Sequence, residues 1–192
     1  MRAASVLRES DIYSNYLMIT LDLPGTHAAS GGLQKQFPSL RAPAPSLPAL
    51  RGFLRRARHA VGISGQVSVL LTTDRSLRRL NREFRGKDKP TDVLSFPAAD
   101  VPVKNTQPPL AGDLAISLDT AARQARSFRH PLETEVRILL LHGLLHLAGY
   151  DHEIDSGEMA TREEQLRRRF RLPTALIARA EIGRSAHRRG RA

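Results

Sequence analysis

The segment HGLLHLAGYDH, residues 142–152, constrains this chain more than any other feature, because it holds three of the seven histidines. His142 and His146 are four residues apart, so on an α-helix both imidazoles lie on the same face, within reach of one ion. Gly149 can adopt positive φ and end the helix, so the chain can double back and bring His152 to the same ion. The spacing therefore predicts a metal site on a helix and the turn after it.

The number and type of these side chains indicate which metal site to expect. Structural zinc sites usually have four protein ligands, whereas catalytic sites leave one position for water or substrate. The chain has no cysteine, so a tight transition-metal site must use imidazole and oxygen ligands, which suit zinc and its neighbours. We therefore expect one zinc ion at a catalytic site, held by His142, His146 and His152. The other histidines are expected to be solvent-exposed: His27, His59, His130 and His187.

The same spacing of histidines occurs in the metzincin proteases, where the residue after the first histidine is a glutamate that acts as general base. That position is Gly143 here. Peptide hydrolysis by that mechanism therefore lacks its proton acceptor. A hydrolase of peptides or small esters stays open only if another carboxylate takes the place of that glutamate.

Charge indicates the kind of substrate. The formal net charge is +11 and the isoelectric point is about 11.2, so a polyanion is the natural partner, and nucleic-acid binding with steep salt dependence is expected. Aromatic residues make up only 5% and tryptophan is absent, which argues against an extended base-stacking platform. Binding should therefore depend on phosphate contacts and on the shape of the cleft.

Composition is typical of a soluble globular protein, with 41% hydrophobic and 26% charged residues. No apolar run reaches the length of a membrane span, and the first 17 residues lack the apolar core of a secretory signal. We therefore expect a cytoplasmic protein without a membrane partner. We expect a single domain over residues 18–178, with an N-terminal extension over 1–17 and a basic tail over 179–192.

Hydrophobic periodicity predicts the elements of this domain. Asp74 and Asp119 are the expected N-caps of two helices. On the strand over 110–119, alternation predicts one buried face and one polar face that includes Asp113. The expected strands are 18–25, 66–73, 91–97 and 110–119, and the expected helices are 47–61, the segment after Asp74, 120–129, 133–149, 156–170 and 172–182.

Three sequence blocks together resemble the YbeY family of endoribonucleases. They are HGLLHLAGYDH, the segment NREFRGKDKPTDVLSFP over residues 81–97, and GDLAIS over residues 112–117. The blocks occur in the family's order, and the resemblance spans about residues 18–178. It implies an α+β fold with a small mixed four-stranded sheet, flanked by about five or six helices, and a metal site at a central helix and the turn after it.

The resemblance also implies an activity. It implies a zinc-dependent, single-strand-specific endoribonuclease that acts in rRNA maturation at the 3′ end of small-subunit rRNA and in ribosome quality control. The implied partners are single-stranded rRNA, the small ribosomal subunit, a small-subunit ribosomal protein and a ribosome-assembly GTPase. His142, His146 and His152 correspond to the zinc ligands of the family, and Arg85 corresponds to an arginine that the family needs for function.

Roles for individual residues follow from their chemistry. Arg85 and His142 are the expected catalytic residues. Arg85 suits this role because a planar guanidinium can make two hydrogen bonds to a phosphate. Lys87 and Lys89 in the same loop should contact the RNA backbone. No general base is evident in the sequence. Asp113, on a strand that could line the cleft, and Asp151, which could hold an imidazole of a ligand, are the candidates for a base or a supporting carboxylate.

A second interpretation belongs to another functional class. A basic chain with a structural zinc site could act as an RNA-binding factor of ribosome assembly, with weak nuclease activity or none. Zinc-dependent cleavage that is lost in a His142→Ala variant distinguishes the enzyme from the binding factor.

Overall fold

A computed structural model describes residues 17–20, 37, 40, 43–98 and 110–173 of the chain. The elements are, in chain order, β1 (Leu17–Thr20), α2 (Leu47–Val61), β2 (Gln66–Thr72), α3 (Asp74–Arg85), β3 (Val93–Pro97), β4 (Leu110–Ser117), α4 (Leu118–Ser127), α5 (Leu132–Leu147) and α6 (Glu158–Phe170). The predicted helix over 47–61 is confirmed at both ends. The helix predicted over 172–182, except for its first two residues, lies outside the described residues, as do the tail and residues 1–16.

The strands form one mixed sheet in the order β1-β2-β4-β3. β1 is antiparallel to β2, β2 is parallel to β4, and β3 is antiparallel to β4. The central pair is therefore the parallel one, and the chain between its two strands includes α3 and β3. An α+β fold with helices around a small mixed sheet was predicted, and this arrangement of helices around a small sheet is confirmed. Five helices lie within the described residues.

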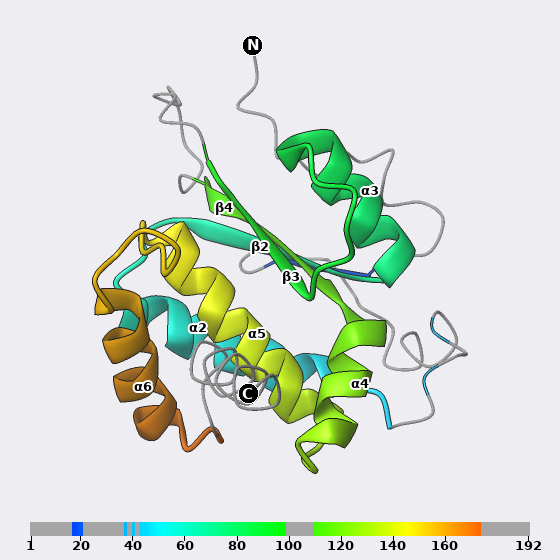
Figure 1. Cartoon of the computed structure of the whole chain (residues 1–192). Coiled ribbons are helices and arrows are strands. Elements are labelled where there is room, and N and C mark those ends of the chain that lie inside the picture. The colour runs from blue at the N-terminus through cyan, green and yellow to red at the C-terminus, as the bar shows by residue number, and fades with distance from the viewer. Residues whose placement is uncertain (1–16, 21–36, 38–39, 41–42, 99–109, 174–192) are drawn as a thin grey trace, which may run out of the picture.

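Helices cover both faces of the sheet, as Figure 1 shows. α5 crosses one face, with α2, α4 and α6 around it, and α3 lies on the opposite face. Leu114 and Ile116 of β4 belong to the larger core beneath α5, whereas Ala115 packs with Leu77 and Leu80 of α3 in a second core. The predicted polar face of β4 is therefore wrong, because α3 buries it.

α5 is the central helix, as its apolar sequence predicts. Eleven of its sixteen residues are buried, because helices or the sheet surround it on most sides. It begins at Leu132 after Pro131, whose fixed φ suits the start of a helix. None of the described helices has both the length and the apolarity needed to cross a membrane.

Two predicted helix caps are wrong by one or two residues. Thr73 and Ser117, not Asp74 and Asp119, accept the capping hydrogen bonds at the starts of α3 and α4. The two aspartates instead join the helices to each other. The backbone N–H of Asp74 donates to Asp119, and the Asp74 carboxylate accepts from the hydroxyls of Ser117 and Thr120. These contacts link residues more than 40 positions apart, so local patterns could not indicate them.

His130 was expected to be exposed, and that expectation is wrong. Its side chain is only 10% exposed, and its Nε2 atom lies 2.9 Å from Oε2 of the fully buried Glu135. His130 follows α4 and Glu135 lies in the first turn of α5, so this pair fastens the turn between the two helices. His59, on α2, is exposed as predicted.

Candidate metal centre

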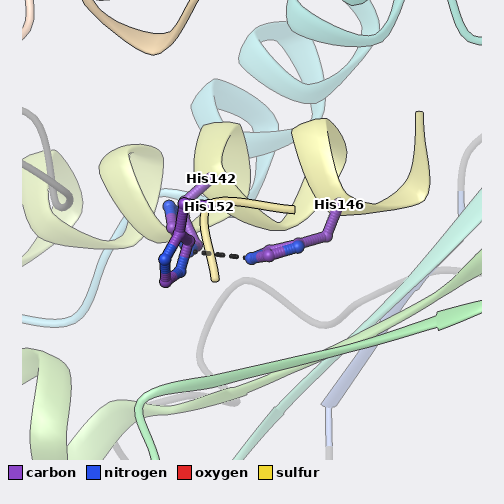
Figure 2. A group of neighbouring side chains, drawn as sticks. All are labelled: His142, His146 and His152. Carbon is purple, nitrogen blue, oxygen red and sulfur yellow. Dashed lines mark hydrogen bonds between the residues drawn. The ribbon is translucent and has the colours of Figure 1, made fainter. Parts of the chain in front are cut away.

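α5 presents His142 and His146 one turn apart at its C-terminal end. The Nε2 atoms of the two rings face each other at 3.2 Å, and the ring planes are 76° apart. Figure 2 shows the two rings with that of His152 on the same side of α5, pointing toward a common point. The two histidines thus lie on one face of α5, as their spacing of four residues predicts.

The turn between α5 and α6 brings in the third ring. Gly149 has φ +89°, which lets the chain leave the helix and reverse direction. The His152 ring centroid lies 5.3 Å from those of both His142 and His146. Asp155 secures the far side of the turn, since its carboxylate accepts hydrogen bonds from the backbone N–H groups of Gly157 and Met159 at the start of α6.

The three rings fit the geometry of a metal ion with nitrogen ligands. One ligand atom from each of His142, His146 and His152 lies within 4.8 Å of the others. Two nitrogens bound tetrahedrally to zinc at 2.0–2.1 Å lie about 3.3 Å apart, close to the 3.2 Å seen between His142 and His146. The predicted convergence of the rings is confirmed, while their role as metal ligands stays a prediction.

The three histidines differ in how deeply they are buried. His142 is buried, His146 is half-buried and His152 is exposed, so the cluster opens to solvent on the His152 side. Burial lowers the pKa of His146 to about 4, helped by the neighbouring His142 and His152, while Asp151 and a hydrogen bond to the backbone of Tyr150 act in the opposite direction. The His146 ring is therefore neutral near pH 7 and offers a nitrogen lone pair.

Glu163 of α6 is a member of the site that the sequence interpretation missed. It is 1% exposed, and its Oε1 atom lies 3.0 Å from Nδ1 of His142. A signal for it was present in the sequence. Glu163 falls four residues after Met159 and three before Leu166, which places a carboxylate on the apolar stripe of an amphipathic helix. A carboxylate in such a position needs a polar partner.

Gly143, which follows the first histidine, faces the sheet. A β-carbon at this position would lie 2.8 Å from Cδ2 of the fully buried Leu114 and 3.3 Å from Oγ of Ser95. The position therefore has no room for the glutamate that metzincin proteases carry there. Glu163 does not replace it, because Glu163 contacts Nδ1, on the side of the His142 ring away from His146. Neither of these two positions therefore supplies the base that the peptidase interpretation needs.

The expected RNA-binding residues lie at the end of α3 and in the loop after it. Arg85 is the last residue of α3, and Arg85, Lys87 and Lys89 are all exposed. The loop is fastened by the Asn81 side chain, which donates to the carbonyl of Lys89 at 2.8 Å. α3 covers the face of the sheet opposite α5. Within the part of the chain that the structure describes, no contact joins the side chains of Arg85, Lys87 and Lys89 to the three histidines. Their role stays a prediction.

The two carboxylates proposed to support the site differ in where they lie. Asp113 is 1% exposed, and its place between Gly112 and Leu114, which both approach α5, puts its side chain on the α3 face of the sheet. The expectation that it lines the site is therefore wrong. Asp151 Oδ1 accepts a hydrogen bond from the backbone N–H of Glu153, so this carboxylate shapes the turn that carries His152.

Neighbouring polar residues have structural contacts. Ser95 donates to the carbonyl of Gly143 at 3.2 Å, which ties β3 to α5 beside the histidines. Asp92 accepts from its neighbour Val93 and from the side chain of Gln124 on α4. These contacts tie the second sequence block to α5 and to α4.

Comparison with known proteins identifies the family. A family model described as Endoribonuclease YbeY matches residues 49–171. The chain is 54% identical to "Endoribonuclease YbeY" of Koribacter versatilis over 127 residues, 66% of this chain and 79% of the relative. It is 49% identical to "Endoribonuclease YbeY" of Solibacter usitatus over 142 residues, 73% and 91% of the two chains. A solution structure of TM1509 from Thermotoga maritima is similar at 32% identity and a TM-score of 0.44, over 62% and 77% of the two chains. The chain belongs to the endoribonuclease YbeY family.

Proposed function

We propose that this chain is a zinc-dependent endoribonuclease that cleaves single-stranded RNA. Membership of the family makes it a nuclease and therefore a hydrolase. The observation that carries the finer proposal is the cluster of His142, His146 and His152, whose ring nitrogens face one another within 4.8 Å and which opens to solvent at one side. This arrangement supports a catalytic site better than a closed structural one.

The three histidines would hold the zinc ion through ring nitrogens. When bound, such an ion polarises a phosphate group as a Lewis acid and lowers the pKa of water. The chain contributes a neutral His146, because burial lowers the pKa of that ring to about 4. It also contributes an approach for substrate, since His152 is exposed whereas His142 is buried.

Basic side chains supply the attraction for RNA. The net charge of +11 favours a polyanion, and phosphate contacts release counterions when they form. We assign Arg85 the contact that stabilises charge on a phosphate, since its guanidinium can make two parallel hydrogen bonds, and Lys87 and Lys89 the contacts to the RNA backbone. All three side chains are exposed and free of the buried core.

The biological substrate we propose is the 3′ end of small-subunit rRNA, with a further part in ribosome quality control. The partners would be the small ribosomal subunit, one of its proteins and a ribosome-assembly GTPase, in the cytoplasm. These proposals rest on family membership and on the basic charge of the chain.

The nucleophile can be identified from the product ends. Attack by the 2′-hydroxyl of the substrate leaves a 2′,3′-cyclic phosphate, whereas attack by water leaves a linear phosphate. Mass spectrometry of the fragments distinguishes the two routes without any assumption about which carboxylate or water accepts the proton.

The test compares purified wild type with His146→Ala and, as a matched control, His59→Ala, which removes an exposed histidine from α2. Each protein is assayed for zinc content and for cleavage of single-stranded and duplex RNA, with and without chelator. We expect the wild type and the control to cleave single-stranded RNA until chelator is added, and His146→Ala to lose both zinc and cleavage. Equal cleavage by all three proteins would overturn the proposal, because it would point to a contaminant or another site.

A further inference from the structure

α6 places a buried carboxylate behind one of the three histidines. Glu163 Oε1 lies 3.0 Å from Nδ1 of His142, and both side chains are nearly excluded from solvent, at 1% and 6% exposure. We propose that Glu163 is a positioning residue that fixes the orientation and the tautomer of His142, so that its Nε2 atom is ready to bind a metal ion. This inference rests on the proposed function.

The tautomer follows from hydrogen-bond chemistry. A carboxylate accepts hydrogen bonds, so the ring nitrogen that faces Glu163 must carry a proton. A neutral imidazole has only one N–H, and Nε2 of His142 then bears the lone pair. That atom is the one that faces Nε2 of His146 at 3.2 Å. Glu163 thus directs the electron pair of His142 toward the centre of the cluster.

A contribution to stability does not explain why Glu163 is buried beside His142. Glu163 occupies the apolar stripe of α6, with Met159 and Leu166 buried on either side. An apolar residue there would bury itself without the desolvation cost of a charge, and replacement of buried ion pairs by well-packed apolar residues is often neutral or stabilising. A carboxylate behind a metal-binding histidine has a use that an apolar residue lacks, because it orients the ring and raises the basicity of the ligand nitrogen.

The surrounding contacts hold Glu163 in place. Asp155 caps the start of α6 through the backbone N–H groups of Gly157 and Met159. Arg162, next to Glu163, donates to the carbonyl of Ala60 at the end of α2 with a distance of 2.9 Å. A single segment from the turn into α6 therefore supplies both the His152 ring and the carboxylate that orients His142.

A second buried glutamate that contacts a histidine provides a control for substitution of Glu163. Glu135 at the other end of α5 is also fully buried and also contacts a histidine, since Oε2 lies 2.9 Å from Nε2 of His130. Glu135 and His142 are seven residues apart on the helix, about 10 Å along its axis. Glu135→Gln thus makes the same chemical change in a similar environment, away from the three histidines.

The experiment measures zinc affinity by competition with a chelator, in the absence of RNA, for wild type, Glu163→Gln and Glu135→Gln. We expect Glu163→Gln to bind zinc about 10- to 100-fold more weakly than the wild type. Glu135→Gln should stay within about twofold of the wild type, since that pair does not face the cluster. The amide of glutamine can donate to Nδ1 and favour the tautomer protonated at Nε2, in which Nε2 has no lone pair for a metal ion.

A second measurement reads the tautomer directly. Ring ¹⁵N shifts of His142 in zinc-free protein should show Nδ1–H in the wild type and in Glu135→Gln, and a larger share of Nε2–H in Glu163→Gln. Unchanged affinity together with an unchanged tautomer in Glu163→Gln would overturn the inference, and so would an equal loss in both glutamine variants. Absence of tight zinc binding in the wild type would instead overturn the proposed function, while the tautomer measurement would still decide the role of Glu163.

Discussion

Gly143 on α5 and Leu114 on β4 are packed so closely that a β-carbon on the glycine would lie 2.8 Å from Cδ2 of the leucine. Leu114 is fully buried and belongs to the main core. The helix can carry its two histidines this near to the sheet only because the residue between them that faces β4 has no side chain.

Replacement of Gly143 by alanine should therefore destabilise the fold. Overpacking of a buried site costs about 1–3 kcal/mol, which the better helix propensity of alanine, about 1 kcal/mol, offsets only in part. The measurement is the free energy of unfolding in urea. Gly52→Ala on α2 is the control, since its β-carbon would meet only the end of the Arg56 side chain at 3.4 Å. That variant should be as stable as the wild type or more so. Equal effects of the two substitutions would contradict this account.

Asp74 should stabilise the junction of α3 and α4 in a pH-dependent way. Burial alone would raise the pKa of Asp74, but hydrogen bonds from Ser117, Thr120 and Arg123 and the charge of Arg123 lower it below the ordinary 3.8. Because the pKa of Asp74 is lowered in the folded state, its contribution to the free energy of unfolding is complete above about pH 4. That contribution is lost as the pH falls through the pKa that Asp74 has in the folded protein. Asp74→Asn should reduce the free energy of unfolding at pH 7 by about 1–3 kcal/mol and flatten its decline in acid.

The control for Asp74 is another aspartate that forms a salt bridge with an arginine. Asp88 pairs with Arg78, but the two side chains are 48% and 55% exposed. Exposed pairs contribute little, so Asp88→Asn should leave the free energy of unfolding nearly unchanged. A larger loss from Asp88→Asn than from Asp74→Asn would contradict the stabilising role of Asp74 at the junction between α3 and α4.

The metal-free protein should lose stability in mild acid through His146. Because burial lowers the pKa of His146 from 6.5 to about 4, the unfolded chain takes up a proton at this residue before the folded chain does. The contribution of His146 to the free energy of unfolding is complete above pH 6.5 and is lost as the pH falls through about 4. Urea unfolding with chelator present, repeated between these pH values, should give a steeper loss in the wild type than in His146→Gln. The same slope for both proteins would exclude His146 as the cause.

Arg85 should matter for cleavage and leave zinc binding unchanged. A charge-assisted hydrogen bond to phosphate contributes about 1.5–3 kcal/mol, so Arg85→Ala should lower kcat/KM for single-stranded RNA about 10- to 100-fold. Arg82→Ala removes the same charge from the same last turn of α3 and is the control. We expect a much smaller effect there. If both substitutions reduce cleavage equally, Arg85 acts only through the net charge of the surface.

Periodicity along the sequence predicted the elements well, since α2 and the buried α5 follow directly from hydrophobic spacing. The helix starts were wrong at Asp74 and Asp119 because each carboxylate is used by the other helix, 45 residues away. Alternation on β4 separated Asp113 from Leu114 but did not indicate that α3 covers the Asp113 face. Spacing within one strand does not tell which helices pack on each side.

The histidine cluster was predictable because its members lie within eleven consecutive residues, where helix geometry and one glycine determine the outcome. Glu163 was missed because its partner, His142, lies 21 residues earlier in the chain. His130 was misjudged for a similar reason, since its exposure depends on how Glu135 is oriented at the start of α5. Local spacing therefore predicts which groups can act together, while the packing of helices determines what supports them.

The central claim is that His142, His146 and His152 bind one metal ion and leave room for substrate. The most direct measurement is anomalous diffraction at the zinc edge from crystals of the zinc-loaded protein. The account predicts a single strong peak, bound by a nitrogen of each of the three histidines and by no other protein side chain. A peak elsewhere, or a fourth protein ligand that closes the site, would contradict it.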